Sequence, residues 1–262
     1  MSTEAERTGL HSLPVELLYE IQLYALSKDL PYTSQHIRDV FISASPRYRA
    51  QYLLERAKTS NSISRSDIFS RVLRYGLCSK DVIEALIPML LDDPLSISSQ
   101  RYELPRRLFR RLAPKTSSDQ WKDHDEPLPF LQYLFTIPDI PTPYIDSHDG
   151  YALTKAVHAR FVPLIQYLLG QGASPARKHA LAVTVAIRKK DLELVKLLVE
   201  RRDPVLVTKK GKAKKRKLHD RLDVTPAMLK TAVKCDARDI VDYLIQEKGV
   251  IPDMQTLQML LG

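Results

Sequence analysis

The feature that most constrains the fold is a short pattern that recurs along the second half of the chain. A large apolar residue is followed three and four positions later by Ala and a β-branched residue, and the copies lie at offsets of 30 and 46. The copies are Leu153–Ala156–Val157, Val183–Ala186–Ile187 and Leu229–Ala232–Val233. A recurring motif of this kind predicts stacked copies of one supersecondary unit, each covering the apolar face of its neighbour.

A second motif repeats beside the first. Residues 130–135 (FLQYLF), 164–169 (LIQYLL) and 240–245 (IVDYLI) carry Tyr at matching positions, and we expect these tyrosines, Tyr133, Tyr167 and Tyr243, to pack between neighbouring units. Each copy therefore reads as a short helix with a small Ala, a polar turn, and a longer amphipathic helix. The extra length before the third copy is a basic insertion, which we place at residues 205–222, and we expect residues 209–221 to lie outside the core.

These motifs resemble the ankyrin repeat, whose usual period is about 33 residues. The resemblance covers residues 149–253 and is carried by Asp149–Gly150, by residues 164–175 (LIQYLLGQGASP), by residues 191–198 (DLELVKLL) and by Thr225–Pro226. It implies a helical solenoid that binds other proteins, in a domain of residues 149–262.

The repeats depart from the ankyrin pattern at one turn. The glycine expected before each outer helix is replaced by Arg160, Lys190 and Asp236. We interpret residues 66–137 as degenerate helical or ankyrin-like repeats. Residues 254–261 are interpreted as a terminal half-repeat that covers the last apolar face.

The N-terminal 60 residues predict a separate helical module. Leu13, Leu17, Ile21 and Tyr24 share one helical face, and Pro14 suits a first helical turn. Two more helices are predicted over residues 34–43 and 46–58. The whole chain is thus predicted to be all-α, a helical module followed by a repeat solenoid.

The start of this module resembles an F-box, the helical module that docks ubiquitin-ligase substrate receptors onto a SKP-family adaptor. The matching core reads Leu13, Pro14, Leu17 and Ile21, and the resemblance implies that these residues bind the adaptor. The later tryptophan-containing part of the motif is not evident. In the alternative interpretation the four residues cap the solenoid and are all buried. F-box-like starts followed by degenerate ankyrin repeats are similar to a large class of fungal proteins.

The net charge of +9 comes mainly from one segment. Residues 209–217 (KKGKAKKRK) contain seven basic residues and no acid, so the rest of the chain is nearly balanced. Within that segment Lys214, Lys215, Arg216 and Lys217 have the form of a nuclear import signal. This predicts a nuclear protein. If the segment is not an import signal, we expect a cytoplasmic protein. The alternatives are a solvated loop or an RNA-binding tail.

Basic residues also recur after the small-residue pair of each inner helix. We call six of them the basic ladder: His158, Arg160, Arg188, Lys189, Lys190 and Lys234. In the ankyrin fold such positions face the concave surface. In this chain no acid occupies the equivalent inner-helix positions. The ladder therefore predicts a partner with an acidic segment. The alternative is that these cations stabilise the dipoles of the helix ends.

The sequence favours no enzyme, cofactor or metal site. Phosphate-binding glycine loops, the G-x-S-x-G motif and H-E-x-x-H are absent. Residues 123–126 (DHDE) are interpreted as a solvated loop, Cys78 and Cys235 indicate a reducing compartment, and no apolar run suits a membrane span or a signal peptide. We therefore expect a non-enzymatic interaction scaffold, possibly the substrate receptor of an SCF-type ubiquitin ligase. The alternative is a chromatin- or nucleic-acid-associated factor.

Three local expectations concern the middle of the chain. Asp67 is predicted to cap a helix, and Pro88 to cut the helix that contains Val82 and Leu86. The spacing of Leu104, Leu108 and Leu112 predicts a further helix, followed by a polar loop over residues 115–126 that contains Trp121, the single tryptophan.

Overall fold

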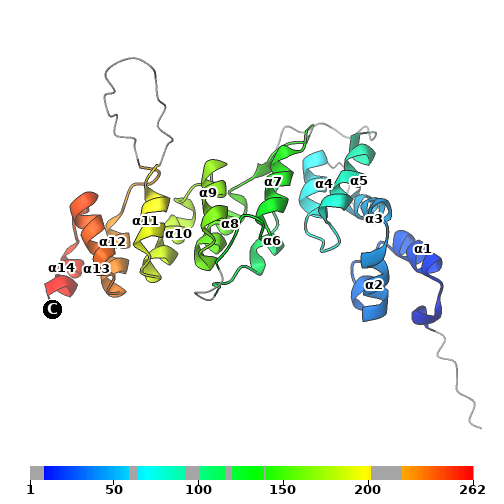
Figure 1. The fold of residues 1–262 in the computed structure, drawn as a ribbon, viewed down its shortest axis with the longest axis horizontal. Helices are drawn as coiled ribbons and strands as arrows, with labels where there is room; N and C mark the ends of the chain where they lie inside the picture. The colour runs from blue at the N-terminus through cyan, green and yellow to red at the C-terminus, as the bar shows by residue number, and fades with distance from the viewer. Residues whose placement is uncertain are drawn as a thin grey trace, which may run out of the picture. The chain divides into compact units, whose positions relative to one another are not determined.

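The computed structural model describes residues 9–58, 64–91, 101–115, 120–138, 140–201 and 220–261. The chain is mostly helical, as predicted, with one short parallel pair of strands, β1 (Tyr102–Glu103) and β2 (Pro143–Tyr144) (Figure 1). It divides into two compact units, Met1–Pro105 with Phe130–Tyr144, and Arg106–Pro129 with Ile145–Gly262. No helix in the described part of the chain has the length and apolarity needed to cross a membrane.

The first unit contains the predicted N-terminal helices. Its helices are α1 (Val15–Ala25), α2 (Gln35–Ser43), α3 (Pro46–Lys58), α4 (Arg65–Val72), α5 (Lys80–Leu91) and most of α7 (Leu128–Thr136), with single 3₁₀ turns at Leu10–Ser12 and Leu30–Tyr32. The inner side of α1 buries Leu18 against Ile37 and Phe41 of α2. Tyr48 of α3 donates a hydrogen bond to the carbonyl of Tyr19 at 2.8 Å, and Tyr52 donates one to the carbonyl of Ser27 at 2.8 Å. These bonds attach α3 to the α1 segment.

Of two predictions about helix ends in this unit, the one on Asp67 is confirmed in part and the one on Pro88 is wrong. The N-cap of α4 is Ser64, and Asp67 is the third helical residue of a capping box, in which each side chain accepts from the other's backbone N–H. Helix α5 continues through Pro88. Pro88 is exposed while Leu86 and Leu90 are fully buried, so the packing of the leucines offsets the hydrogen bond that proline cannot donate.

The leucine spacing between residues 104 and 112 does not mark a long helix. Only α6 (Arg107–Arg110) forms there, and Leu104 lies just after β1. Leu104, Phe109 and Leu112 are buried. The apolar spacing therefore reflects burial of an irregular segment and not helical periodicity.

The second unit is built from helices that follow one another in pairs. They are α8 (Ser147–Ala159), α9 (Val162–Gly170), α10 (Arg177–Arg188), α11 (Leu192–Val199), α12 (Pro226–Lys234), α13 (Arg238–Asp242) with a π-helical turn at Tyr243–Glu247, and α14 (Met254–Leu261). Helix α8 packs against α9, α10 against α11, and α12 against α13. The first helices of these pairs also pack in series, α8 on α10, α10 on α12 and α12 on α14.

The turns between paired helices share one backbone conformation. The carbonyls of Ala156, Ala186 and Ala232 each accept a hydrogen bond from the N–H five residues later, at 3.0, 3.2 and 3.0 Å. The residues just before those donors, Arg160, Lys190 and Asp236, have φ of 56°, 54° and 50°. This is the helix-ending turn that usually takes glycine, so the sequence alignment at offsets of 30 and 46 describes real structural equivalence.

Replacing Lys190 with glycine should stabilise the second unit. A residue with a Cβ is strained in the left-handed region, and Lys190 is exposed, so glycine should raise the free energy of unfolding by about 0.5–1 kcal/mol. Denaturant unfolding followed by circular dichroism measures the change. Lys189→Gly is the matched control, because Lys189 has φ of −85° and its replacement should destabilise the unit. Equal effects of the two substitutions would contradict the prediction.

Trp121 is docked at the turn between α8 and α9. Its ring stacks on Phe161, with centroids 4.7 Å apart and planes inclined by 14°, and its Nε1–H donates to the carbonyl of Ala159 at 3.0 Å. The Lys115 ammonium lies 4.2 Å from the Trp121 ring centre. The described residues of this segment are loop, as predicted, but the loop is docked on α8 through its tryptophan. The single tryptophan is therefore a probe of this unit.

The two ends of the basic segment are held together. The backbone N–H of Arg221 donates to the carbonyl of Val199 at 2.7 Å, and its Nε donates to the carbonyl of Glu200 at 3.2 Å. The Lys248 ammonium bonds to the carboxylates of both Glu200 and Asp220, at 3.2 and 3.0 Å. Asp220 and Arg221 are thus attached to the fold by polar contacts, but neither is buried in the core. Residues 209–219 of the predicted excursion lie outside the described residues.

Candidate functional site

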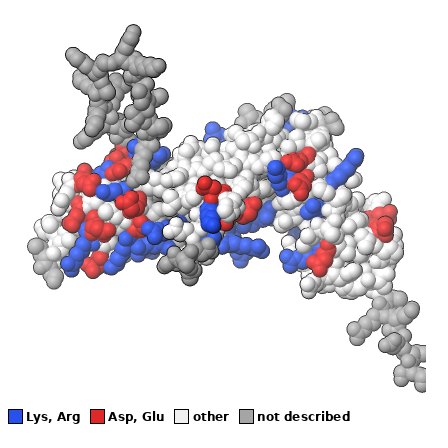
Figure 2. Space-filling view, in the orientation of Figure 1, with Lys and Arg blue, Asp and Glu red and all other residues white. Residues whose placement is uncertain are grey.

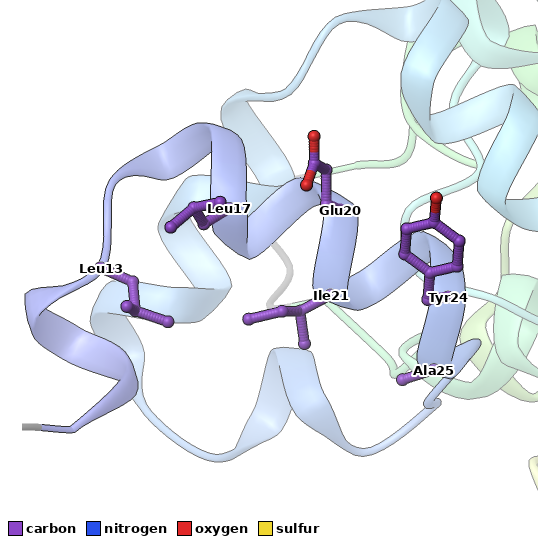
Figure 3. A pocket seen from close by; sticks show the side chains of 6 residues that line it. All are labelled: Leu13, Leu17, Glu20, Ile21, Tyr24 and Ala25. Carbon is purple, nitrogen blue, oxygen red and sulfur yellow. The ribbon is translucent and has the colours of Figure 1, made fainter.

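An open apolar groove lies along α1 (Figure 3). Its volume is about 630 Å³, and it is lined by Leu13, Leu17, Glu20, Ile21, Tyr24 and Ala25. Three of the four residues that the sequence assigned to adaptor binding, Leu13, Leu17 and Ile21, therefore lie on one surface. Pro14 is exposed at the N-cap of the same helix.

Side chains in this groove are available to solvent. Leu17 is 44% exposed and Tyr24 is 88% exposed, whereas Leu18 and Gln22, on the opposite side of α1, are buried. Leu13 and Ile21 are half-buried, because they also pack against the cluster of Leu18, Ile37 and Phe41, so the open part of the groove is at Leu17 and Tyr24. The interpretation in which all four predicted residues are buried does not describe this unit, because Pro14 and Leu17 are exposed.

The adaptor assignment from the sequence omitted three residues of the groove. Glu20, Tyr24 and Ala25 line it together with Leu17 and Ile21. Residues spaced by three, four and seven positions share a helix face, so the spacing from Leu17 to Glu20, Ile21 and Tyr24 contained this signal. Val15 is similarly exposed, at 40%, but does not line the groove.

All six residues of the basic ladder are exposed, but they are not equivalent. Arg160 donates from Nε to the Asp191 carboxylate at 2.7 Å, and Asp191 also caps α11 by accepting from the N–H of Leu194. Asp191 is not at an inner-helix position, but it pairs with Arg160 and so reduces the charge that the ladder presents. This arginine links the turn after α8 to the start of α11.

The charge of the ladder at neutral pH does not include His158. Desolvation lowers the pKa of His158, and the nearby positive charges of Lys189 and Lys155 lower it further, so the imidazole is neutral under physiological conditions. Lys189 donates from Nζ to the carbonyl of His158. The ladder's positive charge therefore rests chiefly on Arg188, Lys189, Lys190 and Lys234.

The ladder follows the C-terminal ends of the first helices. Arg188 ends α10 and Lys234 ends α12, so both cations complement helix dipoles. In Figure 2, Lys and Arg side chains gather along the lower edge of the second unit, and acidic side chains lie mostly above them. Because Arg188 and Lys234 are exposed, they can complement helix dipoles and still meet a partner.

The other predicted residues form no further site within the part of the chain that the structure describes. Lys214, Lys215, Arg216 and Lys217 lie outside the described residues. Among the residues that are described, no group of three or more His, Cys, Asp or Glu side chains could hold a metal ion. In the residue 123–126 loop, the backbone of Lys122 and the Lys115 ammonium bond to Asp125 and lower its pKa.

Comparisons with known proteins identify no relative of this chain. No protein-family model matches the sequence, and neither curated proteins nor solved structures contain a significant match.

Proposed function

We propose that this protein is a non-enzymatic interaction scaffold with two binding surfaces. The groove on α1 recruits a SKP-family adaptor, and the second unit is an ankyrin-type solenoid that binds an acidic segment of a target protein. In this role the chain is the substrate receptor of an SCF-type ubiquitin ligase acting in the nucleus. The observation that carries the proposal is the open groove, which is lined by three of the four residues that resemble the F-box core.

The physical argument for docking rests on the cost of exposing apolar side chains. Leu17 and Tyr24 present apolar surface to water at positions where the unit needs none for its own core, since Leu18 on the opposite side packs with α2. Burying such a groove against a helical partner releases water and contributes binding free energy in proportion to area. Glu20, within the groove, supplies one charge that can select a partner with a basic residue.

Leu17→Asp should abolish adaptor binding. A charge placed in the centre of the groove must be desolvated when the partner docks, which should weaken binding at least about 30-fold. Pull-down of a purified SKP-family adaptor with the full-length protein measures the loss. Val15→Asp is the matched control, because Val15 is equally exposed on the same helix but does not line the groove.

Two results would contradict adaptor docking at this groove. The wild-type chain could fail to bind the adaptor, or Val15→Asp could weaken binding as much as Leu17→Asp. Circular dichroism and thermal unfolding show whether each variant remains folded, with α1 packed against α3.

The basic ladder supports the proposal for the second unit. Arg188, Lys189 and Lys234 are exposed at equivalent ends of successive helices, where stacking places them side by side. Long-range attraction to an acidic segment acts mainly on the association rate and is screened by salt. Each exposed contact is individually worth little, so single changes should be mild and combined changes cumulative.

The combined variant Arg188→Glu, Lys189→Glu, Lys234→Glu should weaken partner binding and flatten its salt dependence. Its control is Lys28→Glu, Arg38→Glu, Arg47→Glu, which makes the same change in net charge at exposed positions of the first unit. Binding of an acidic peptide or of a co-purified partner is measured across a salt series. Unchanged affinity and an unchanged salt slope in the folded variant would show that the ladder residues only stabilise the helix dipoles.

The alternative function is binding of chromatin or nucleic acid through the basic insertion. The charge density of residues 209–217 favours it. Nucleic-acid binding that falls steeply with salt, and is lost when those residues are deleted, would support this alternative over the scaffold.

A further inference from the structure

Helix α14 is the last helix of the described residues (Figure 1), and it leaves an apolar face uncovered. It packs against α12 as α12 packs against α10 and α10 against α8. Each earlier first helix is also covered by its own second helix, α9, α11 or α13. In the described part of the chain no second helix follows α14. The predicted terminal half-repeat therefore covers α12 but exposes an apolar face of its own.

Comparison with α12 shows how much is uncovered. Thr225 precedes α12 as Asp253 precedes α14, and this alignment matches Leu229 with Leu257 and Ala232 with Leu260. The two α12 residues are fully buried, whereas Leu257 is 39% and Leu260 is 41% exposed. Met254 is 74% and Ile251 is 82% exposed. We call Ile251, Met254, Leu257 and Leu260 the C-terminal apolar face.

These residues lie on one side of the helix. Met254, Leu257 and Leu260 are spaced by three, so they form a continuous strip, while Thr256 on another side is fully buried. At the opposite end of the series, α6 packs against α8. The series of first helices is thus covered at one end and open at the other.

The chemistry of the face favours a second copy of this chain as its occupant. Residues 254–261 (MQTLQMLL) contain no ionisable side chain. The net charge of +9 comes mainly from residues 209–217, and two of these uncharged faces meet without opposing like charges. An acidic or basic partner finds no charge to pair with on this strip.

The area is sufficient for a weak, specific contact. The four side chains expose on the order of 400 Å² per copy, and pairing two copies together with the flanking glutamines buries about 1,000 Å², the lower limit for a specific interface. Area alone does not set affinity, but we expect a contact at this lower limit to be weak and reversible.

We propose that the C-terminal apolar face binds the same face of a second copy, forming a two-fold symmetric dimer. Each α14 then takes the place that the next first helix would occupy in the other copy's series. In an isologous contact the residues nearest the axis meet their own equivalents. Leu257 and Gln258 are central in α14, so residue 257 of one copy lies close to residue 257 of the other.

Sedimentation of the full 262-residue chain over a concentration series tests the dimer. We expect a reversible monomer–dimer equilibrium, and we expect Leu257→Glu to weaken it at least about 30-fold. Met254→Glu changes a mostly exposed side chain that the fold does not need, and should also weaken it. Leu17→Asp, in the groove of α1, is the control and should leave the dimer unchanged, which separates this proposal from adaptor docking.

A mixing experiment tests the two-fold arrangement. Leu257→Glu and Leu257→Lys should each be monomeric alone, and a mixture of the two should recover dimers because opposite charges meet at the axis. Circular dichroism and Trp121 emission confirm that each variant is folded. A wild-type chain that stays monomeric at several hundred micromolar, a dimer that persists in Leu257→Glu, a dimer lost in Leu17→Asp, or a mixture that stays monomeric would each overturn the proposal.

Discussion

Replacing Ala186 with leucine should lower the free energy of unfolding of the second unit by about 1–3 kcal/mol. Ala186 is fully buried on α10, and α10 packs against both α8 and α12. Ala156 and Ala232 are likewise fully buried at the equivalent positions of those two helices. A larger side chain in the middle layer must therefore displace a helix on one side or adopt an unfavourable rotamer.

Denaturant unfolding followed by Trp121 emission measures this loss, because Trp121 is docked on the same unit through Phe161. Ala227→Leu is the matched control. Ala227 lies on α12 and is exposed, and leucine is nearly as good a helix former as alanine, so stability should change by less than about 0.5 kcal/mol. If Ala186→Leu were equally neutral, the helices would not approach closely at the small residue, and the repeat alignment would lose its physical basis.

The order of the repeated elements could be predicted because their signals are local and recur. An Ala that permits close helix approach and the apolar residue three positions before it occur at each copy, and the structure places all three alanines at fully buried positions. The turn residues were harder to interpret. Arg160, Lys190 and Asp236 do not resemble glycine, yet they adopt its conformation, because the hydrogen bond from the following residue to the alanine carbonyl closes the turn.

Packing across long sequence distances accounts for what could not be predicted. Pro88 is a helix breaker by its own chemistry, but α5 tolerates it because Leu86 and Leu90 are buried. Trp121 lies in a polar stretch, and nothing within that stretch indicates that its ring will stack on Phe161, 40 residues later. Local sequence thus indicated elements, whereas contacts between elements decided helix ends and loop positions.

The candidate surfaces show the same division. Leu17, Ile21 and Tyr24 share a helix face by spacing alone, so the groove of α1 was accessible to sequence reasoning. The ion pair between Arg160 and Asp191 joins residues 31 apart. Its formation depends on how α8 and α11 meet, so counting charges along equivalent positions overestimated the charge that the ladder presents.

Deleting residues 209–217 should abolish nuclear accumulation and leave the stability of the fold nearly unchanged. The deletion removes seven basic residues, including the predicted import signal at Lys214–Lys217. The segment leaves and rejoins the fold at neighbouring points, because Arg221 bonds to Val199 and Glu200, and Lys248 bridges Glu200 and Asp220. Since those contacts lie outside the deletion, the free energy of unfolding should change by less than about 0.5 kcal/mol.

Two further variants separate import from folding. Replacing only Lys214, Lys215, Arg216 and Lys217 with alanine keeps the length of the segment and should also abolish accumulation of a fluorescent fusion in the nucleus. Extending the deletion through Arg221 removes its hydrogen bonds and the Asp220 partner of Lys248, and should cost about 1–3 kcal/mol of unfolding free energy. Nuclear accumulation that survives the four alanines would show that the chain enters the nucleus by another route. Unfolding of the second unit by the shorter deletion would show that the insertion is part of the fold.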